Sequence, residues 1–246
     1  MDKVKHFLKK TKVKTFFIKG EKIKLLLKED VFPPSINGIF VAENIIINPG
    51  ETIVDVGTGS GIIAILSAKL GGKVFGTDIN DASINLAKDN SIRNNIFGVF
   101  KKSEYLNCFS QKFDVIVANL PQDIVHDNYK EYIGDHLFQT ISGGTEGNSH
   151  IINFLKNAHN NMHNNTRLYL PVYTDVCFKP ILKEIQKNYD YKIIASKEYE
   201  TREFVEYNKE LFLKLNAEKK IKIFLKNGKW IAKEYLFELK LKQKNN

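Results

Sequence analysis

The feature that most constrains the fold of this chain is a glycine-rich stretch, Val54-Asp55-Val56-Gly57-Thr58-Gly59-Ser60-Gly61. Apolar residues from Glu51 onward predict a short strand before it, and Ile62–Leu70 predicts an amphipathic helix after it. Glycine has no Cβ, so a ligand can approach the backbone of such a turn closely. A strand that passes through the turn into a helix directs free N–H groups and the positive end of the helix dipole outward. The pattern therefore predicts a βα unit with a ligand site at its turn.

A second strand, Lys73–Asp78, is predicted next and ends in a carboxylate. Asp78 lies about 20 residues past the first glycine, the spacing at which an acid binds a ribose in a βαβ nucleotide site. A phosphate-binding loop would need Lys and then Ser or Thr after the last glycine, where Ile62-Ile63 stand instead. The glycines also depart from the dinucleotide fingerprint, since the third falls at the fifth place rather than the sixth. Asp55 favours a ligand that carries positive charge.

Together these residues resemble motif I of the class I S-adenosylmethionine-dependent methyltransferases, with Asp78 as their ribose-binding acid. The resemblance implies an α/β, Rossmann-like fold with a seven-stranded, mostly parallel sheet, and S-adenosyl-L-methionine as cofactor. Glu104 follows Ser103 where many of these enzymes have Gly-Asp, whose acid accepts the adenine amino group. The cofactor-binding residues that the resemblance implies are Asp55, Gly57, Thr58, Gly59, Gly61, Asp78, Ile79, Glu104 and Asn119. An ordinary glycine-rich turn without a ligand is the alternative.

A tetrapeptide, Asn119-Leu120-Pro121-Gln122, follows the continuous apolar strand predicted for Phe113–Ala118 and should reach the same sheet edge as the glycine turn. It resembles the Asn-Pro-Pro-Tyr signature of enzymes that methylate amino groups of glutamine, adenine or guanine. The resemblance implies a catalytic loop of Asn119, Leu120 and Pro121, in which the Asn119 amide and the Leu120 carbonyl hold the target amine in line. Gln122 cannot stack on a flat target as tyrosine does. A turn without chemistry is the alternative.

Two further segments resemble protein-modifying groups of this family. Ser60–Ile65 resembles the first helix of the ribosomal-protein methyltransferases, whose loop reads Asn-Ile-Leu. Ile141–Gly147 resembles the Gly-Gly-x-x-Gly segment of the release-factor glutamine methyltransferases. The order of motifs supports kinship over residues 31–200.

The rest of the chain predicts an N-terminal basic extension over residues 1–30 and a methyltransferase domain over 31–246. The extension should contain a short helix and a hairpin, whose strands are Thr15–Lys19 and Lys22–Leu27. In the family resembled, a proline-containing loop such as 31–38 closes over the methionine end of the cofactor. Asn227-Gly228 predicts a hairpin within a basic antiparallel region at about 200–246. Asp123–Gln139 is expected to be rich in loops, and further elements are predicted at Ile39–Ile45, Ala82–Asn95, Phe97–Phe100, Ile151–Ala158, Thr166–Val172, Phe178–Lys187, Tyr191–Ser196 and Glu234–Leu239.

The net charge of +9 comes from the two ends, which carry +6 over residues 1–30 and +7 over 209–246, against −4 between them. This excess is either a surface for RNA or acidic protein, or solvated lysines. No stretch approaches the roughly 18 apolar residues of a membrane span. Cys108 and Cys177 are isolated, so a cytoplasmic protein without disulfides is expected. His159 and His163 have a spacing that could bind metal on a helix, but no Glu follows His159, and no metal is expected.

These features lead us to expect an enzyme that transfers a methyl group to a nitrogen of a protein side chain. An RNA base methyltransferase that uses the basic ends and a small-molecule N- or O-methyltransferase are alternatives. A non-enzymatic alternative is an inactive module that binds S-adenosylmethionine. The sequence determines neither the acceptor atom nor the oligomeric state.

Overall fold

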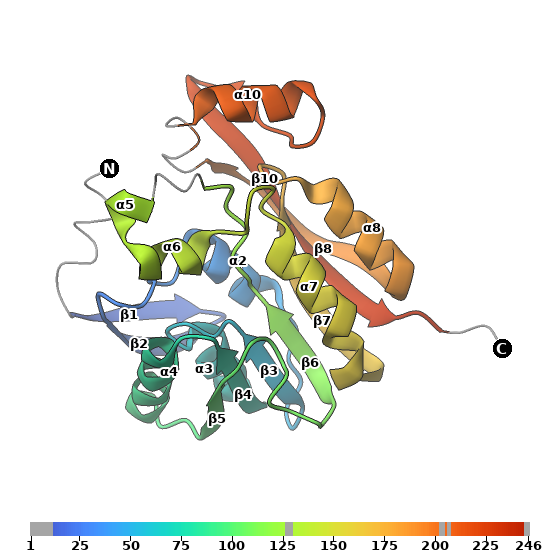
Figure 1. The fold of residues 1–246 in the computed structure, drawn as a ribbon. Coiled ribbons are helices and arrows are strands. Elements are labelled where there is room, and N and C mark those ends of the chain that lie inside the picture. The colour runs from blue at the N-terminus through green and yellow to red at the C-terminus, as the bar shows by residue number, and fades with distance from the viewer. Residues whose placement is uncertain (1–11, 126–129, 202–204, 206–207, 244–246) are drawn as a thin grey trace.

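A sheet of eight strands forms the centre of the computed structural model, which describes residues 12–125, 130–201, 205 and 208–243 (Figure 1). Seven strands lie side by side in the order β5-β4-β3-β6-β7-β10-β8, and the short β9 pairs with β10. The strands from β5 to β7 run parallel, while β10 is antiparallel to both of its neighbours. This confirms the predicted seven-stranded, mostly parallel sheet. The bounds are β3 Thr52–Val56, β4 Lys73–Asp78, β5 Gly98–Lys102, β6 Phe113–Ala118, β7 Met162–Tyr173, β8 Tyr189–Glu200, β9 Phe224–Lys226 and β10 Lys229–Leu241.

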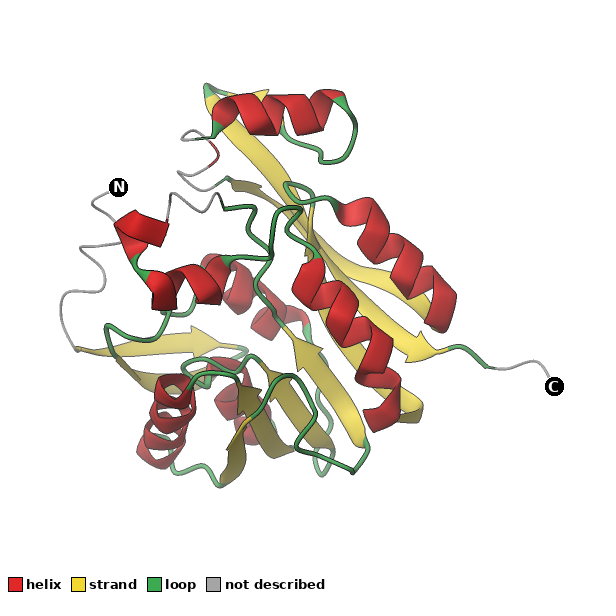
Figure 2. Cartoon of the chain, in the orientation of Figure 1, coloured by secondary structure: helices red, strands yellow, loops and turns green. Residues whose placement is uncertain are grey.

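Helices cover both faces of this sheet, because a parallel sheet is apolar on both sides (Figure 2). Alternate residues of β6 show the two faces: Val115 and Val117 belong to one apolar cluster, Ile116 and Ala118 to another. The first cluster includes residues of α2 (Ile36–Asn44), α3 (Ile62–Lys69) and α4 (Asp81–Arg93); the second includes residues of α7 (Ser149–Ala158) and α8 (Phe178–Asn188).

An antiparallel hairpin, β1 (Lys12–Ile18) and β2 (Glu21–Leu27), adds a further layer outside α3 and α4. Its turn lies at Lys19-Gly20, one residue earlier than expected, and both residues have a positive φ, of 53° and 80°. Such a turn matches the twist of the two strands. The hairpin prediction is confirmed, whereas the short helix expected before it lies outside the described residues.

Helix α3 is the element whose character differs most from expectation. Its residues from Ile62 to Ser67 are all buried, so the predicted amphipathic pattern is wrong. The sheet lies on one side of α3 and the hairpin on the other, and a helix covered on both sides needs no polar face. Only the tertiary position of residues 12–27 explains this.

Two asparagines, Asn90 of α4 and Asn94 at its C-cap, bind the edge of β2 as a neighbouring strand would. Asn90 accepts from the Leu26 N–H at 2.7 Å and donates to the Leu26 carbonyl at 3.1 Å. One helical turn later, Asn94 makes the same pair of bonds with Lys24, at 2.9 and 2.8 Å. These amides satisfy backbone groups of an edge strand and fix the hairpin on α4.

The region between Asp123 and Gln139 was expected to be rich in loops, and this is wrong for its second half. It contains two short helices, α5 (Lys130–Ile133) and α6 (Asp135–Ile141), joined at Gly134. Helices this short show no apolar periodicity in a sequence. Helix α10 (Lys209–Ala217) was also not predicted, and β10 is one long strand that includes the expected Glu234–Leu239.

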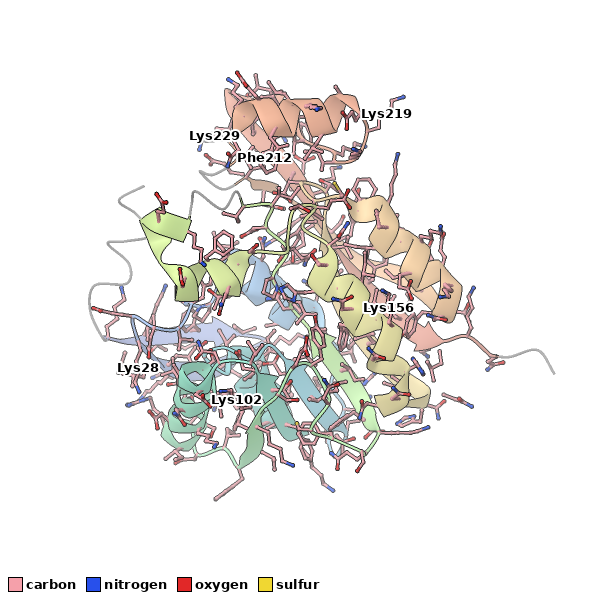
Figure 3. All side chains as sticks on the ribbon, in the orientation of Figure 1. Lys28, Lys102, Lys156, Phe212, Lys219 and Lys229 are labelled. Atoms are coloured by element: carbon pink, nitrogen blue, oxygen red, sulfur yellow. The ribbon has the colours of Figure 1, made fainter. Side chains whose placement is uncertain are left out.

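The basic C-terminal region is rich in lysines, and two of them, Lys219 and Lys229, lie at one end of the molecule (Figure 3). Several pair with glutamates of β8: Lys226 with Glu198 at 2.8 Å and Lys229 with Glu200 at 2.6 Å. Such exposed pairs contribute little stability, but they cancel positive charge locally. Among the described residues, no helix is long and apolar enough to cross a membrane.

Candidate functional site

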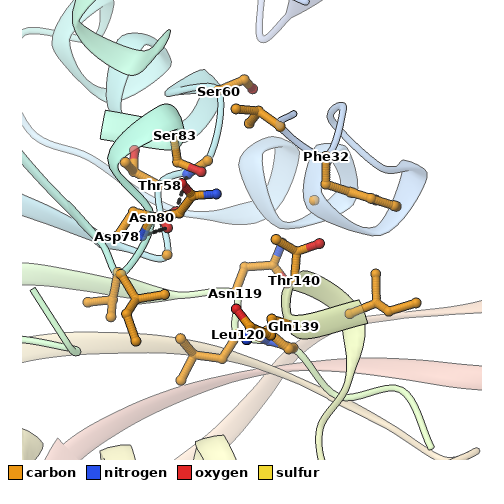
Figure 4. A pocket seen from close by; sticks show the side chains of 18 of the residues that line it. Phe32, Thr58, Ser60, Asp78, Asn80, Ser83, Asn119, Leu120, Gln139 and Thr140 are labelled. Atoms are coloured by element: carbon orange, nitrogen blue, oxygen red, sulfur yellow. Dashed lines mark hydrogen bonds between the residues drawn. The ribbon is translucent and has the colours of Figure 1, made fainter. Parts of the chain in front are cut away.

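A cavity of about 550 Å³ opens at the carboxyl ends of β3, β4 and β6 (Figure 4). This is the edge at which open α/β sheets bind ligands. The glycine turn after β3 forms one wall, the loop before α2 a second, and α6 a third. Of the residues predicted to act at this site, the cavity is lined by Asp55, Gly57, Thr58, Gly59, Asp78, Ile79, Glu104, Asn119, Leu120 and Pro121.

The glycine turn has a backbone that other residues adopt only with strain. Gly57, Gly59 and Gly61 have φ values of 74°, 52° and 85°. The N–H groups of Gly57 and Thr58 both donate to the Thr77 carbonyl at 2.8 Å, which ties the turn to the end of β4. The turn is therefore shaped before any ligand binds.

Gly61 is the one predicted cofactor residue that does not line the cavity. A Cβ at this position would lie 3.3 Å from both Cα and Cβ of Ala87 in α4. Gly61 thus lets the start of α3 pack closely against α4, and its contribution to the site is indirect.

Asp78 lies at the tip of β4 with its carboxylate held by two backbone donors. The Gly59 N–H donates to Oδ2 at 3.0 Å, and the Asn80 N–H donates to Oδ1 at 2.9 Å. Asn80 itself caps α4 through a 2.9 Å bond from the Ala82 N–H. The glycine turn and the second strand therefore meet at one oriented carboxylate, which Figure 4 shows beside Thr58.

Asp55 is a buried carboxylate beneath the turn. It is 2% exposed, and its Oδ2 accepts a 2.8 Å bond from the Thr58 hydroxyl. Burial raises the pKa of Asp55 to about 7, although the Thr58 hydrogen bond opposes the shift. A cation bound in the cavity would favour the ionised form of this group.

The wall beyond Asp78 contains Glu104, which is exposed, and Ile79, which is 67% exposed. Sequence reasoning missed two neighbours there, Tyr105 and His150, which line the cavity and lie 3.2 Å apart between the phenol oxygen and Nδ1. Burial lowers the pKa of His150. Nothing in the local pattern links residues 45 positions apart.

Asn119 directly follows the end of β6 and has Tyr173 and α2 as neighbours. Its Oδ1 accepts a long, 3.5 Å hydrogen bond from the Tyr173 hydroxyl. Its Nδ2 faces α2, where a Cβ on Gly38 would lie only 3.2 Å away. The Leu120 side chain is buried in the apolar cluster below the sheet edge, and both Leu120 and Pro121 line the cavity.

Gln122 stands where the resembled signature has tyrosine, and its side chain turns into the protein. Nε2 donates to the Pro171 carbonyl at 3.0 Å, and Oε1 accepts from the Tyr173 N–H at 3.3 Å. The residue is 2% exposed. As expected, it cannot stack on a planar substrate; instead it fixes the loop to β7.

The loop before α2 lines the cavity at Val31, Phe32, Pro33, Pro34 and Ser35; its closure over a ligand stays a prediction. Helix α6 contributes Gln139 and Thr140 from the opposite side, which sequence reasoning missed (Figure 4).

The two histidines considered for metal binding do not share a helix. His159 begins a 3₁₀ turn, whereas His163 lies in β7 with its Nε2 3.0 Å from Asp114 Oδ1. In the part of the chain that the structure describes, no group of three or more potential ligands is arranged around a metal position.

The family described as ribosomal protein L11 methyltransferase (PrmA) matches residues 38–165, just over half of the chain. This chain belongs to the ribosomal protein L11 methyltransferase family. The matched segment contains the glycine turn, Asp78 and the Asn119 loop. The L11 methyltransferase-like chain is therefore a class I methyltransferase enzyme, as the motifs predicted.

Relatives of this L11 methyltransferase family member differ in the length they share. A Methanocaldococcus jannaschii protein, named among the protein N5-glutamine methyltransferases, is 32% identical over 139 residues, which are 56% of this chain and 70% of that protein. The ribosomal protein L11 methyltransferase of Dictyoglomus turgidum is 43% identical over 77 residues, 31% of this chain and only 26% of that one. The crystal structure of the ribosomal protein L11 methylase from Lactobacillus delbrueckii subsp. bulgaricus superposes with a TM-score of 0.52 at 20% identity, covering 87% of this chain and 82% of that one. This last likeness supports the fold.

Proposed function

We propose that this enzyme transfers a methyl group from S-adenosyl-L-methionine to a nitrogen of a protein side chain. The observation that carries the proposal is the oriented carboxylate of Asp78, fixed by Gly59 and Asn80 at the end of β4 and facing the same cavity as Asn119. A ribose-binding acid and an amine-binding amide thus border one ligand space.

The residues present fit a cationic nucleoside. Gly57 and Gly59 leave room for close approach to the backbone, and Asp78 presents a carboxylate to ribose hydroxyls. The buried Asp55 has a raised pKa, and a sulfonium or ammonium charge nearby would stabilise its ionised form. Ile79 and Glu104 would border the adenine. The cofactor supplies an electrophilic methyl group; the chain binds and orients the two reactants.

Asn119 would position the acceptor. An amide nitrogen or a neutral amine must direct its lone pair at the methyl carbon, and fixed acceptors that bind its N–H groups hold that geometry. Asn119 Oδ1 and the Leu120 carbonyl are the acceptors at the cavity edge. This role does not require the side chain to exchange a proton.

A protein acceptor is favoured over RNA by the position of Gln122. Its amide is engaged with β7, so the loop offers no aromatic face on which a flipped base would stack. At the basic C-terminal end, Lys226 and Lys229 pair with Glu198 and Glu200, which reduces the positive charge that this end would present to phosphates. The names of two relatives, a protein N5-glutamine methyltransferase and a ribosomal protein L11 methyltransferase, agree with a protein acceptor.

Radiolabelled S-adenosylmethionine tests the proposal with two probes, total ribosomal proteins stripped of RNA and protein-free ribosomal RNA. We expect label in the protein fraction that protease removes and nuclease does not. The Asn119→Ala variant should incorporate label about 10²–10³-fold more slowly. Label confined to the RNA probe would refute the protein substrate while leaving the cofactor assignment intact.

A further inference from the structure

The hydroxyl of Tyr173 donates a 3.5 Å hydrogen bond to the Asn119 amide oxygen at the edge of the cavity, although the two residues are 54 positions apart. We propose that Tyr173 is a positioning residue for methyl transfer, which orients the amide of Asn119 so that its oxygen faces the acceptor. This inference rests on the proposed function, because it assigns Asn119 the task of binding the acceptor amine.

Tyr173 is itself held firmly at the end of β7. Its backbone N–H donates to Gln122 Oε1, and Gln122 Nε2 donates to the Pro171 carbonyl. The side-chain amide of Gln122 therefore binds the backbone of β7 on both sides of Val172. Its ring packs edge-on against Tyr199 at 5.8 Å, and the Tyr199 hydroxyl donates to Asp175 Oδ1 at 2.7 Å. The Tyr173 side chain is 6% exposed. Its hydroxyl therefore has a defined place next to the catalytic loop.

A hydroxyl in this place distinguishes the two ends of the Asn119 amide. The amide carries an oxygen that accepts and a nitrogen that donates, and rotation by half a turn would exchange them. The Tyr173 O–H donates to the oxygen, while the nitrogen faces α2 near Gly38. Gly38 gives that nitrogen room, since a Cβ there would approach it to 3.2 Å, a tight contact.

The consequence concerns the second lone pair of Asn119 Oδ1. A carbonyl oxygen has two acceptor sites, so one can bind Tyr173 while the other receives an N–H of the methyl acceptor. The 3.5 Å distance is long for a hydrogen bond, and hydrogen bonds at catalytic sites commonly shorten when the reactants bind.

This arrangement accounts for the unusual loop sequence. In the resembled signature the fourth residue is aromatic and faces the substrate. Here Gln122 faces β7 instead and places Tyr173 against Asn119. Gln122 therefore acts on the site indirectly, because its side chain fixes the backbone of Tyr173. The hydroxyl that contacts Asn119 belongs to Tyr173 of β7.

The test uses two analogues of the cofactor and needs no known substrate. S-adenosylhomocysteine lacks the methyl group, whereas sinefungin carries an amine at that place and so presents N–H groups to Asn119. Both are titrated by calorimetry into the wild type and into Tyr173→Phe, Asn119→Ala and the double variant. Tyr191→Phe is the matched control, because it removes a hydroxyl whose hydrogen bond with Gln186 is also 3.5 Å long but lies away from the cavity.

We expect Tyr173→Phe to weaken sinefungin about fivefold, the effect of losing one modest hydrogen bond, with S-adenosylhomocysteine unchanged. In the Asn119→Ala background the same substitution should have no further effect, because the two residues act as one unit. Tyr191→Phe should bind both analogues as the wild type does.

Equal weakening of both analogues by Tyr173→Phe would show a merely structural role and overturn the inference. So would wild-type sinefungin affinity in Tyr173→Phe, or additive losses in the double variant. If the wild type binds neither analogue, the proposed cofactor site fails and the inference fails with it, which is a result distinct from the other three.

Discussion

The two halves of the cavity are built in different ways. The donor half, from the glycine turn to Asp78, consists of consecutive pieces of one βαβ unit whose backbone groups hold one another: Gly57 and Thr58 bind Thr77, and Gly59 binds Asp78. The acceptor half, around Asn119, is assembled from the loop before α2, from α6 and from the end of β7. Its geometry depends on side chains from distant parts of the chain.

The difference teaches that cofactor binding and acceptor positioning should respond separately to substitution. A change in the donor half should alter the affinity for S-adenosylmethionine. A change in the acceptor half should alter turnover and leave that affinity nearly intact. Each prediction below either separates the two halves or shows where they are coupled.

The largest effect is expected for Asn119→Ala. Turnover should fall about 10²–10³-fold, as for loss of a preorganised group that stabilises the reacting geometry. S-adenosylmethionine affinity should stay within about twofold, since Asn119 would act on the acceptor. Asn44→Ala is the matched control, because its amide caps the carbonyl of Phe40 outside the cavity. Retention of more than a tenth of the turnover would remove Asn119 from its proposed role; steady-state kinetics and calorimetry provide both numbers.

The next effect is on pH dependence, through Asp55. The pKa of Asp55 in the folded protein is raised from 3.8 to about 7, so Asp55 must lose its proton when a cationic ligand binds. The affinity for S-adenosylmethionine should therefore rise about tenfold between pH 6 and pH 8. The isosteric Asp55→Asn variant should lose this rise. By the same linkage, the Asp55 contribution to the free energy of unfolding is largest below pH 4 and declines as pH increases to 7.

A control for this pH effect is Glu234, a buried carboxylate in β10 paired with Lys197 at 3.2 Å. Burial raises its pKa to about 7 as well, but it does not line the cavity. Glu234→Gln should therefore keep the pH dependence of S-adenosylmethionine binding measured by calorimetry. An identical slope in wild type and Asp55→Asn would assign the proton to another group.

The smallest effect is on stability and concerns Gly61. Replacing it by alanine combines a left-handed φ with a Cβ 3.3 Å from Ala87, whereas Gly50→Ala has nearly the same φ, 86°, and nothing within 4 Å. Urea denaturation should show a cost of about 1–2 kcal/mol for Gly50→Ala and about 1 kcal/mol more for Gly61→Ala. Equal costs would mean that Gly61 has no packing role.

The half of the cavity built from one βαβ unit could be predicted from the sequence, and much of the other half could not. Gly57 and Gly59 lie in the turn after β3 and Asp78 ends the next strand, β4, so local pattern and spacing were sufficient to place them at one cavity. Asn119 was predictable because β6 and β3 end at the same sheet edge. Tyr173, His150 and α6 reach the cavity through tertiary packing, which no local periodicity records. The buried character of α3 was missed for the same reason, since the hairpin that covers it is a separate segment.

The central claim is that this cavity binds S-adenosylmethionine through Asp78, and calorimetric titration of the wild type beside Asp78→Ala tests it most directly. Asp89→Ala serves as the control, because that carboxylate lies on α4 and pairs with Lys28 outside the cavity. We predict one site per chain in the wild type and in Asp89→Ala, and affinity about 100-fold weaker in Asp78→Ala, in line with the loss of charge-assisted bonds. Equal affinity in all three proteins, or no binding to the wild type, would contradict the account.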